Sequence, residues 1–194
     1  MKNYHAITDG AGRIQTQFVS QLDERLIDVC AVLDAGADLL SRFDPDHRLR
    51  VEAPLDAARA ALRDAGVSLQ LLTLGHLNAS MSMLRQSAES LCLAYLVKHE
   101  PSLFLLGRRI EIGAASRALH RRHDLGADQA IADRLFTLID RLKESMAGDR
   151  RAALGAAIDR SRMPEYYLQL ENIRRVGEQI TACLRELLLV EAAK

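Results

Sequence analysis

The chain has 194 residues, a hydrophobic fraction of 48%, a charged fraction of 27% and a formal net charge of zero. This length and composition predict one soluble globular domain, and they exclude the overall basic excess that is typical of proteins dedicated to gripping nucleic acid. Trp is absent and aromatic residues make up only 4% of the chain, while Leu and Ala are abundant, which favours helices over sheets.

The N-terminal part is expected to lead directly into a long helix. Residues 1–11 are predicted to be a flexible tail, and residues 12–194 a single helical-bundle domain. A first helix is expected over residues 12–43, because its apolar residues recur at alternating steps of three and four. Pro45 ends this helix, since proline disfavours helix at the residue before it.

The middle of the chain predicts three further helices. A short one is expected over residues 55–65, with Gly66 as its end. A long one follows over residues 68–99 and is closed by Pro101. The next covers residues 102–123, and its two glycines favour a bend.

The last third of the chain completes the predicted bundle. Helices are expected over residues 128–146 and, after Gly148, over residues 149–161. Pro164 begins a final helix with the longest apolar seam of the chain. We therefore predict an all-α fold, a helical bundle of four long helices plus about three shorter ones. The near-heptad seams of the first and last helices also favour a homodimer.

The cysteines and the apolar runs bear on location. Cys30, Cys92 and Cys183 lie far apart, each within an apolar helical run, and form no metal-binding or disulfide pattern. Buried reduced thiols are the expected reading, which favours a cytoplasmic protein. The N-terminus lacks an apolar signal core and no apolar run reaches membrane-spanning length, so no membrane association is expected.

Residues 74–97 carry the most informative pattern. At about 100° per residue, one stripe of this helix is apolar, a second face carries mostly small residues, and a third, narrow stripe is polar. The polar stripe consists of Asn78, Ser82, Arg85 and Glu89. Arg85 and Glu89 are four residues apart, so they can form an ion pair on the helix surface. The alternative is a ligand pocket walled by the polar stripe, in which Arg85 contacts an anion and Glu89 orients the Arg85 side chain.

The stretch NASMSMLRQSAESLCLAYLV, residues 78–97, resembles a helix of uncharacterised bacterial HEPN-like helical-bundle proteins. The resemblance implies a helical and commonly dimeric protein of toxin–antitoxin or phage-defence type. Many HEPN proteins are metal-independent ribonucleases that use an Arg-x4-6-His motif across the dimer interface. The resemblance thus implies RNA as a partner and a catalytic Arg/His pair.

The stretch ASRALHRRHD, residues 115–124, has that spacing in Arg117 and His123, which five residues separate. His moves protons near neutral pH, and Arg stabilises the charge of a phosphoryl transition state. Ala118 follows the arginine where the family usually has a polar residue. A simpler interpretation is favoured, because Gly126 looks like a helix stop and cationic residues suit the last turn of a helix.

Metal and cofactor chemistry finds no support in the sequence. The six histidines are scattered, apart from His120 and His123, and no metal-ligand motif is present. Glycine-rich nucleotide-binding motifs and a nucleophile elbow are also absent. We expect neither a metal nor a cofactor.

These observations favour a non-enzymatic, cytoplasmic helical-bundle protein that acts through homodimerisation or through binding a partner protein. The first alternative is an HEPN-like RNA-binding protein or ribonuclease that uses Arg117 and His123 as catalytic residues. RNA is the less favoured partner because the chain carries no basic excess. The second alternative is a small-ligand-binding bundle whose pocket is walled by the polar stripe.

Overall fold

The computed structural model describes residues 13–43, 51–102, 114–148 and 160–192. Within these ranges the chain forms six α-helices and two short 3-10 helices, without any strand. In chain order they are α2 (Arg13–Leu40), α3 (Glu52–Thr73), α4 (Leu77–His99), α6 (Ala115–His120), η2 (Gly126–Asp128), α7 (Gln129–Gly148), η4 (Arg160–Arg162) and α8 (Met163–Ala192). The predicted all-α fold is confirmed for this part of the chain, whereas the predicted tail lies outside it.

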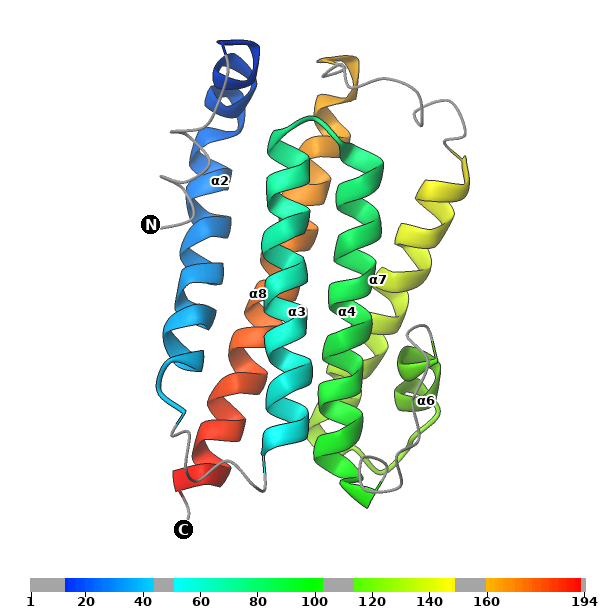
Figure 1. Ribbon diagram of the computed structural model, residues 1–194. Helices are drawn as coiled ribbons and strands as arrows, with labels where there is room; N and C mark the ends of the chain where they lie inside the picture. Colours follow the sequence, from blue (N-terminus) through cyan, green and yellow to red (C-terminus); the bar gives the residue numbers. More distant parts are fainter. Residues whose placement is uncertain (1–12, 44–50, 103–113, 149–159, 193–194) are drawn as a thin grey trace.

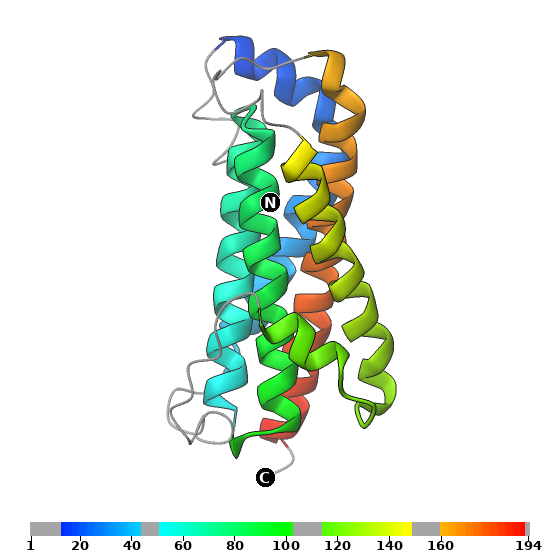
Figure 2. The ribbon, with the colours of Figure 1, turned by 90° about the vertical axis from the view of Figure 1, so that its right-hand side faces the viewer.

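The long helices lie side by side as an elongated bundle (Figure 1). α3 and α4 form an antiparallel hairpin at its centre. α8 packs against α2, α3 and α4, while α7 packs mainly against α4 and α6. Figure 2 shows short α6 beside α4 and α7 at one end of the bundle. α4 therefore lies between the α2–α3–α8 side of the molecule and the α6–α7 side.

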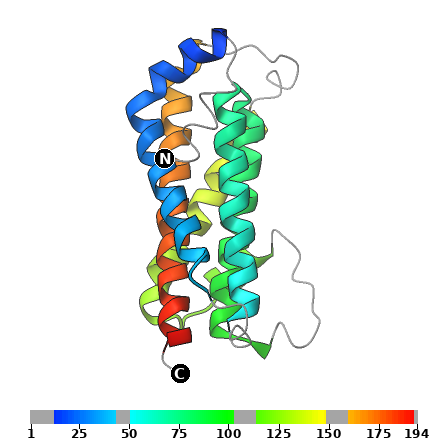
Figure 3. The same cartoon turned by 60° about the vertical axis from the view of Figure 1, so that its left-hand side comes forward.

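α2 and α8 run in the same direction and approach closely (Figure 3). The edge of the Phe18 ring meets the Tyr166 ring, with centroids 4.8 Å apart. Farther along, Gly177 of α8 lies against α2, and a Cβ atom there would be 2.9 Å from Cγ1 of Val32. The absence of a side chain at Gly177 thus sets the spacing of these two helices.

The core follows the apolar stripe predicted on the central helix. Every member of that stripe is buried in α4: Leu77, Met81, Leu84, Ala88, Leu91 and Tyr95. These side chains join the main hydrophobic cluster, to which the other long helices also contribute. The sequence pattern therefore identified a buried face of α4 correctly, although Ser80, Ser87 and Glu89, which lie outside that stripe, are buried as well.

The predicted end of the second helix at Gly66 is wrong. α3 continues through Gly66, where a side chain would meet open space, and ends at Thr73, seven residues later. Gly75 adopts a positive φ of 86°. The N–H of His76 donates to the carbonyl of Leu71, and that of Gly75 to Leu72, each at 2.9 Å. This is a Schellman cap, which glycine favours because it has no Cβ to clash.

The predicted helix over residues 68–99 is consequently divided between α3 and α4. The number of long helices therefore differs from the predicted four. In the described ranges five helices have 20 or more residues, and only α6 is short. Half of the predicted helix over residues 102–123 and most of the one over 149–161 lie outside the described residues. The helices predicted from Asp128 and from Pro164 are confirmed as α7 and α8.

The predicted burial of the three cysteines can be checked directly, because all three lie in described helices. Cys30, Cys92 and Cys183 are free and buried, as expected. Burial raises the pKa of the Cys30 and Cys183 thiols to about 12, so both stay protonated and unreactive near neutral pH. None of the helices described combines the length and the hydrophobicity needed to cross a membrane.

Candidate interaction groove between α7 and α8

α7 and α8 run in opposite directions and are neighbours that scarcely touch. Both pack against α4, but they make few contacts with each other. A groove of about 680 Å³ lies between them. Its described lining residues belong to these two helices: Asp133, Arg134, Leu135, Thr137, Leu138 and Arg141 of α7, and Glu171, Asn172, Arg174, Arg175, Val176, Glu178 and Gln179 of α8. We call this feature the α7–α8 groove.

The floor of the α7–α8 groove is apolar and belongs to the core. Leu135 and Val176 are 2% and 0% exposed, and Leu138 packs partly buried against the same hydrophobic cluster. Because the apolar positions of an amphipathic helix face the bundle interior, the polar positions beside them form the rim of the groove. The α7–α8 groove thus combines an apolar base with charged edges.

The α8 edge is neutralised within the helix. Arg174 makes a bidentate pair with Glu171, with two N–O distances of 2.9 Å, and also pairs with Glu178. Arg175 donates to the same Glu171 at 2.8 Å. These hydrogen bonds, chiefly the one from Arg174, lower the pKa of Glu171 to about 2. Two arginines and two glutamates on this edge therefore compensate one another.

The α7 edge carries two arginines without such compensation. Arg134 and Arg141 are exposed, and neither has a side-chain partner among the described residues. Asp133, the acidic residue of this edge, interacts with two residues that do not line the groove. It accepts from Gln129 at 3.2 Å and contacts Nδ1 of His120 at 3.0 Å. The α7 edge therefore presents unpaired positive charge to solvent.

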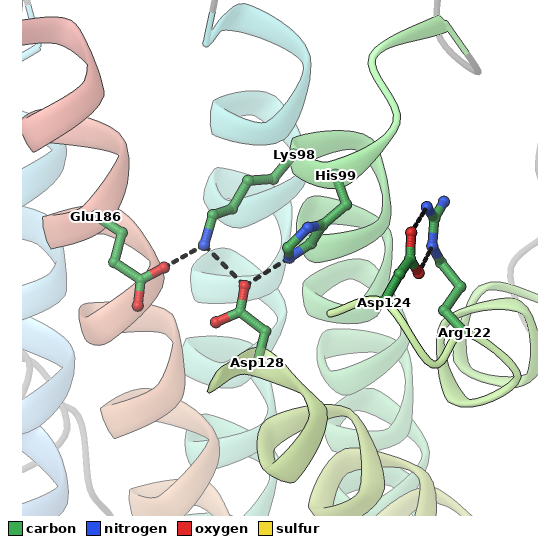
Figure 4. A network of polar contacts seen from close by, with 6 residues as sticks. All are labelled: Lys98, His99, Arg122, Asp124, Asp128 and Glu186. Atoms are coloured by element: carbon green, nitrogen blue, oxygen red, sulfur yellow. Dashed lines mark hydrogen bonds and ion pairs between the residues drawn. The ribbon is translucent and has the colours of Figure 1, made fainter. Parts of the chain in front are cut away.

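A network of charged side chains joins α4, α8 and η2, which leads into α7 (Figure 4). Lys98, at the end of α4, pairs with Asp128 at 2.9 Å and with Glu186 of α8. His99 Nε2 contacts the same Asp128 oxygen at 2.7 Å. Asp128 immediately precedes α7, so Lys98 connects the start of α7 to α8. The pKa of Asp128 is lowered, because the hydrogen bonds from Lys98 and His99 outweigh the cost of burial.

This network is better suited to a structural role than to catalysis. Asp128 is 7% exposed, and its carboxylate is held by two neighbouring cationic or imidazole groups. Lys98 occupies the space between the two carboxylates where a metal ion would have to bind. Among the described residues no group of three or more His, Cys, Asp or Glu side chains is arranged to hold a metal ion.

The predicted catalytic pair, Arg117 and His123, lies near α6. Arg117 is exposed on α6, and His123 is exposed beyond the end of that helix. Neither makes a side-chain interaction with another described residue. Their neighbour Arg122 is engaged: it forms a bidentate pair with Asp124, at 2.9 and 2.6 Å (Figure 4). Arg122 also contacts Glu100. The structure does not bring the predicted pair together within one chain, and its role across a dimer stays a prediction.

The polar stripe of α4 is divided among different environments. Glu89 is 1% exposed and accepts from both the backbone N–H and the hydroxyl of Ser116, at 3.1 and 2.9 Å. It therefore caps the first turn of α6 and does not form the predicted pair with Arg85. Arg85 is half-buried, with its Nε enclosed and without a partner among the described residues. Asn78 is half-buried and Ser82 exposed, and none of the four lines the α7–α8 groove.

The α7–α8 groove was missed by the sequence reasoning. A usable signal existed, because Arg134, Leu138 and Arg141 fall on one face of a predicted helix. Their lack of acidic partners depends on tertiary neighbours and could not be read from spacing. Comparison with protein families, curated proteins and solved structures gives no match for the chain.

Proposed function

We propose that the protein is a non-enzymatic binding protein whose α7–α8 groove receives a helix from a partner protein. The observation that carries this proposal is an open groove with an apolar floor between two helices that pack on α4 but scarcely on each other. An amphipathic helix placed in such a groove buries apolar surface on both sides and extends the bundle by one helix.

The groups in the α7–α8 groove favour binding over catalysis. Among the residues that the structure describes, its lining includes no His, Cys, Ser or Lys. Asp133, Glu171 and Glu178 are each engaged by a neighbouring side chain, and the Thr137 hydroxyl donates to the backbone carbonyl of Asp133 at 2.8 Å. A general base or a nucleophile must be free to exchange a proton, and the groove offers no such group.

Site-specific photocrosslinking in the native host tests this function. The photoreactive residue p-benzoylphenylalanine replaces Thr137 in the groove or, as a matched control, Ala31 on α2; both positions are exposed. We expect irradiation to give a defined adduct only from position 137. Mass spectrometry should place the crosslink in a helical segment of a second protein.

The remaining outcomes contradict the proposal. No adduct at position 137, or the same adducts at both positions, would show that the groove is not a specific binding surface. An adduct made of two copies of this chain would show that the groove is a homodimer interface in place of a site for another protein.

A further inference from the structure

We infer that the helix received by the α7–α8 groove is acidic along the side that faces α7, with two carboxylates two turns apart and apolar residues between them. This inference rests on the proposed function and names the kind of partner. It comes from the arrangement of three side chains on α7: Arg134, Leu138 and Arg141, all of which line the groove.

These three side chains lie on one face of α7. The arginines are seven positions apart, which corresponds to nearly two full turns and a rise of about 10.5 Å. Leu138 lies between them and is partly buried against the core. α7 therefore presents a cation, an apolar surface and a second cation in succession along the groove.

The charges of the two edges differ, and this difference orients the partner. Arg174 and Arg175 on the α8 edge are already paired with Glu171. Arg134 and Arg141 have no acidic partner among the described residues. An apolar helix in the groove would remove water from these two guanidinium groups without replacing their hydrogen bonds, whereas carboxylates would pair with them.

The complementary sequence pattern follows from helix geometry. Residues at i and i+7 lie on the same face of a helix and are separated by the same rise as the two arginines. Residues at i+3 and i+4 lie between them on that face. The partner helix is therefore expected to carry Asp or Glu at i and i+7, with Leu or a similar residue at i+3 and i+4.

A designed peptide tests this pattern on the full chain. The probe is a fluorescein-labelled helical peptide about 15 residues long, with Glu at i and i+7, Leu at i+3 and i+4, and Ala and Gln elsewhere. A second peptide has Lys in place of both Glu residues. Fluorescence anisotropy is expected to show that the Glu peptide binds about tenfold more tightly than the Lys peptide, and that raised salt reduces the difference.

Groove variants locate the binding. The double variant Arg134→Gln and Arg141→Gln is expected to bind the Glu peptide about tenfold more weakly. The matched control, Arg42→Gln and Arg185→Gln, removes two exposed arginines outside the groove and should leave binding unchanged. Arg134→Glu with Arg141→Glu should reverse the preference, so that the Lys peptide binds more tightly. Circular dichroism verifies that each variant remains folded.

The peptide experiment and the crosslinking experiment test different statements. The inference fails if the Glu peptide does not bind, if both peptides bind equally, or if the double Gln variant keeps wild-type affinity. If position 137 nevertheless crosslinks to a partner helix without the acidic pair, the proposed function stands and only the partner's chemistry is wrong. Absence of that crosslink overturns the proposed function itself.

Discussion

Tyr95 is fully buried in α4, yet its hydroxyl has no hydrogen-bond partner among the described residues. Nζ of Lys98 lies 5.3 Å from the centroid of its ring. Loss of water around the hydroxyl, followed by the nearby acidic groups, raises its pKa far above the ordinary value. The hydroxyl therefore stays neutral, and its burial costs free energy that no hydrogen bond offsets.

Replacing Tyr95 by Phe should accordingly leave the protein as stable as the wild type or stabilise it by up to about 1 kcal/mol. The matched control is Tyr166→Phe, which removes a hydroxyl that donates to the carbonyl of Gly75 at 2.9 Å and should cost about 1 kcal/mol. Urea denaturation followed by circular dichroism measures both. A loss at Tyr95 as large as that at Tyr166 would show that the Tyr95 hydroxyl is hydrogen-bonded in solution.

At the same scale, the cluster of Arg and His after residue 116 shows why sequence spacing could not identify the site. Arg122 pairs with Glu100, and His120 with Asp133 while it stacks on Phe136 at 4.2 Å between centroids. These partners lie 22 and 13 residues away in the chain. A helix-dipole interpretation requires only local sequence, so it could not distinguish these engaged side chains from exposed ones such as Arg117.

At the scale of helices, the buried faces were predictable and the helix ends were less so. The period of apolar residues identified the buried stripe of α4, because burial of one face imposes that period. The sequence pattern predicts that α3 ends at Gly66, whereas the helix ends in a cap at Gly75. Of these two glycines, only Gly75 has a positive φ. That choice depends on where α4 must turn back against α3, which is tertiary information.

The close approach of α2 and α8 gives a prediction for Gly177. Substitution by Ala places its Cβ 2.9 Å from Cγ1 of Val32, and a β-branched side chain in a helix has little freedom to move away. Crowding of this kind costs about 1–3 kcal/mol, against a gain of up to about 1 kcal/mol in helix propensity. We expect a net loss of about 1 kcal/mol in the free energy of unfolding, measured in urea.

A second substitution separates crowding from other effects at Gly177. Val32→Ala removes the methyl group that the new Cβ meets, so Gly177→Ala should cost less in that background than in the wild type. The other close atom, Cδ2 of Leu33 at 3.2 Å, belongs to a side chain with more freedom. Equal costs of Gly177→Ala in both backgrounds would show that contact with Val32 does not set the helix spacing.

At the scale of the whole molecule, the amphipathic helices determine that the chain forms a bundle, but they do not determine which neighbours touch. α7 and α8 each have an apolar stripe; both helices pack against α4, and α8 packs also against α2 and α3. The groove between them results from this packing, so no single segment of the sequence predicts it. The same reasoning applies to Lys98, whose two acidic partners come from different helices. Arrangements of this kind depend on the assembled fold.

The Lys98 network therefore connects α4, α7 and α8 through Asp128, and its contribution should depend on pH. The pKa of Asp128 is lowered from the ordinary value of 3.8 by its bonds to Lys98 and His99. A carboxylate with a lowered pKa in the folded state stabilises the protein fully above its unfolded pKa. This stabilisation is lost as the pH falls through the folded pKa.

Asp128→Asn should therefore destabilise the protein near neutral pH by about 1–3 kcal/mol, because Lys98 and His99 lose a buried charged partner. The difference from the wild type should shrink as the pH falls below the ordinary carboxyl pKa of 3.8, where Asp128 of the unfolded chain takes up a proton first, and it should be lost as the pH falls through the lowered pKa of the folded state. Urea denaturation at a series of pH values measures it. Asp38→Asn, which changes an exposed residue without a side-chain partner among those described, is the matched control. The free energy of unfolding of Asp128→Asn could instead differ from that of the wild type by the same amount from neutral to acid pH. This result would show that the charge of Asp128 does not hold the three helices together.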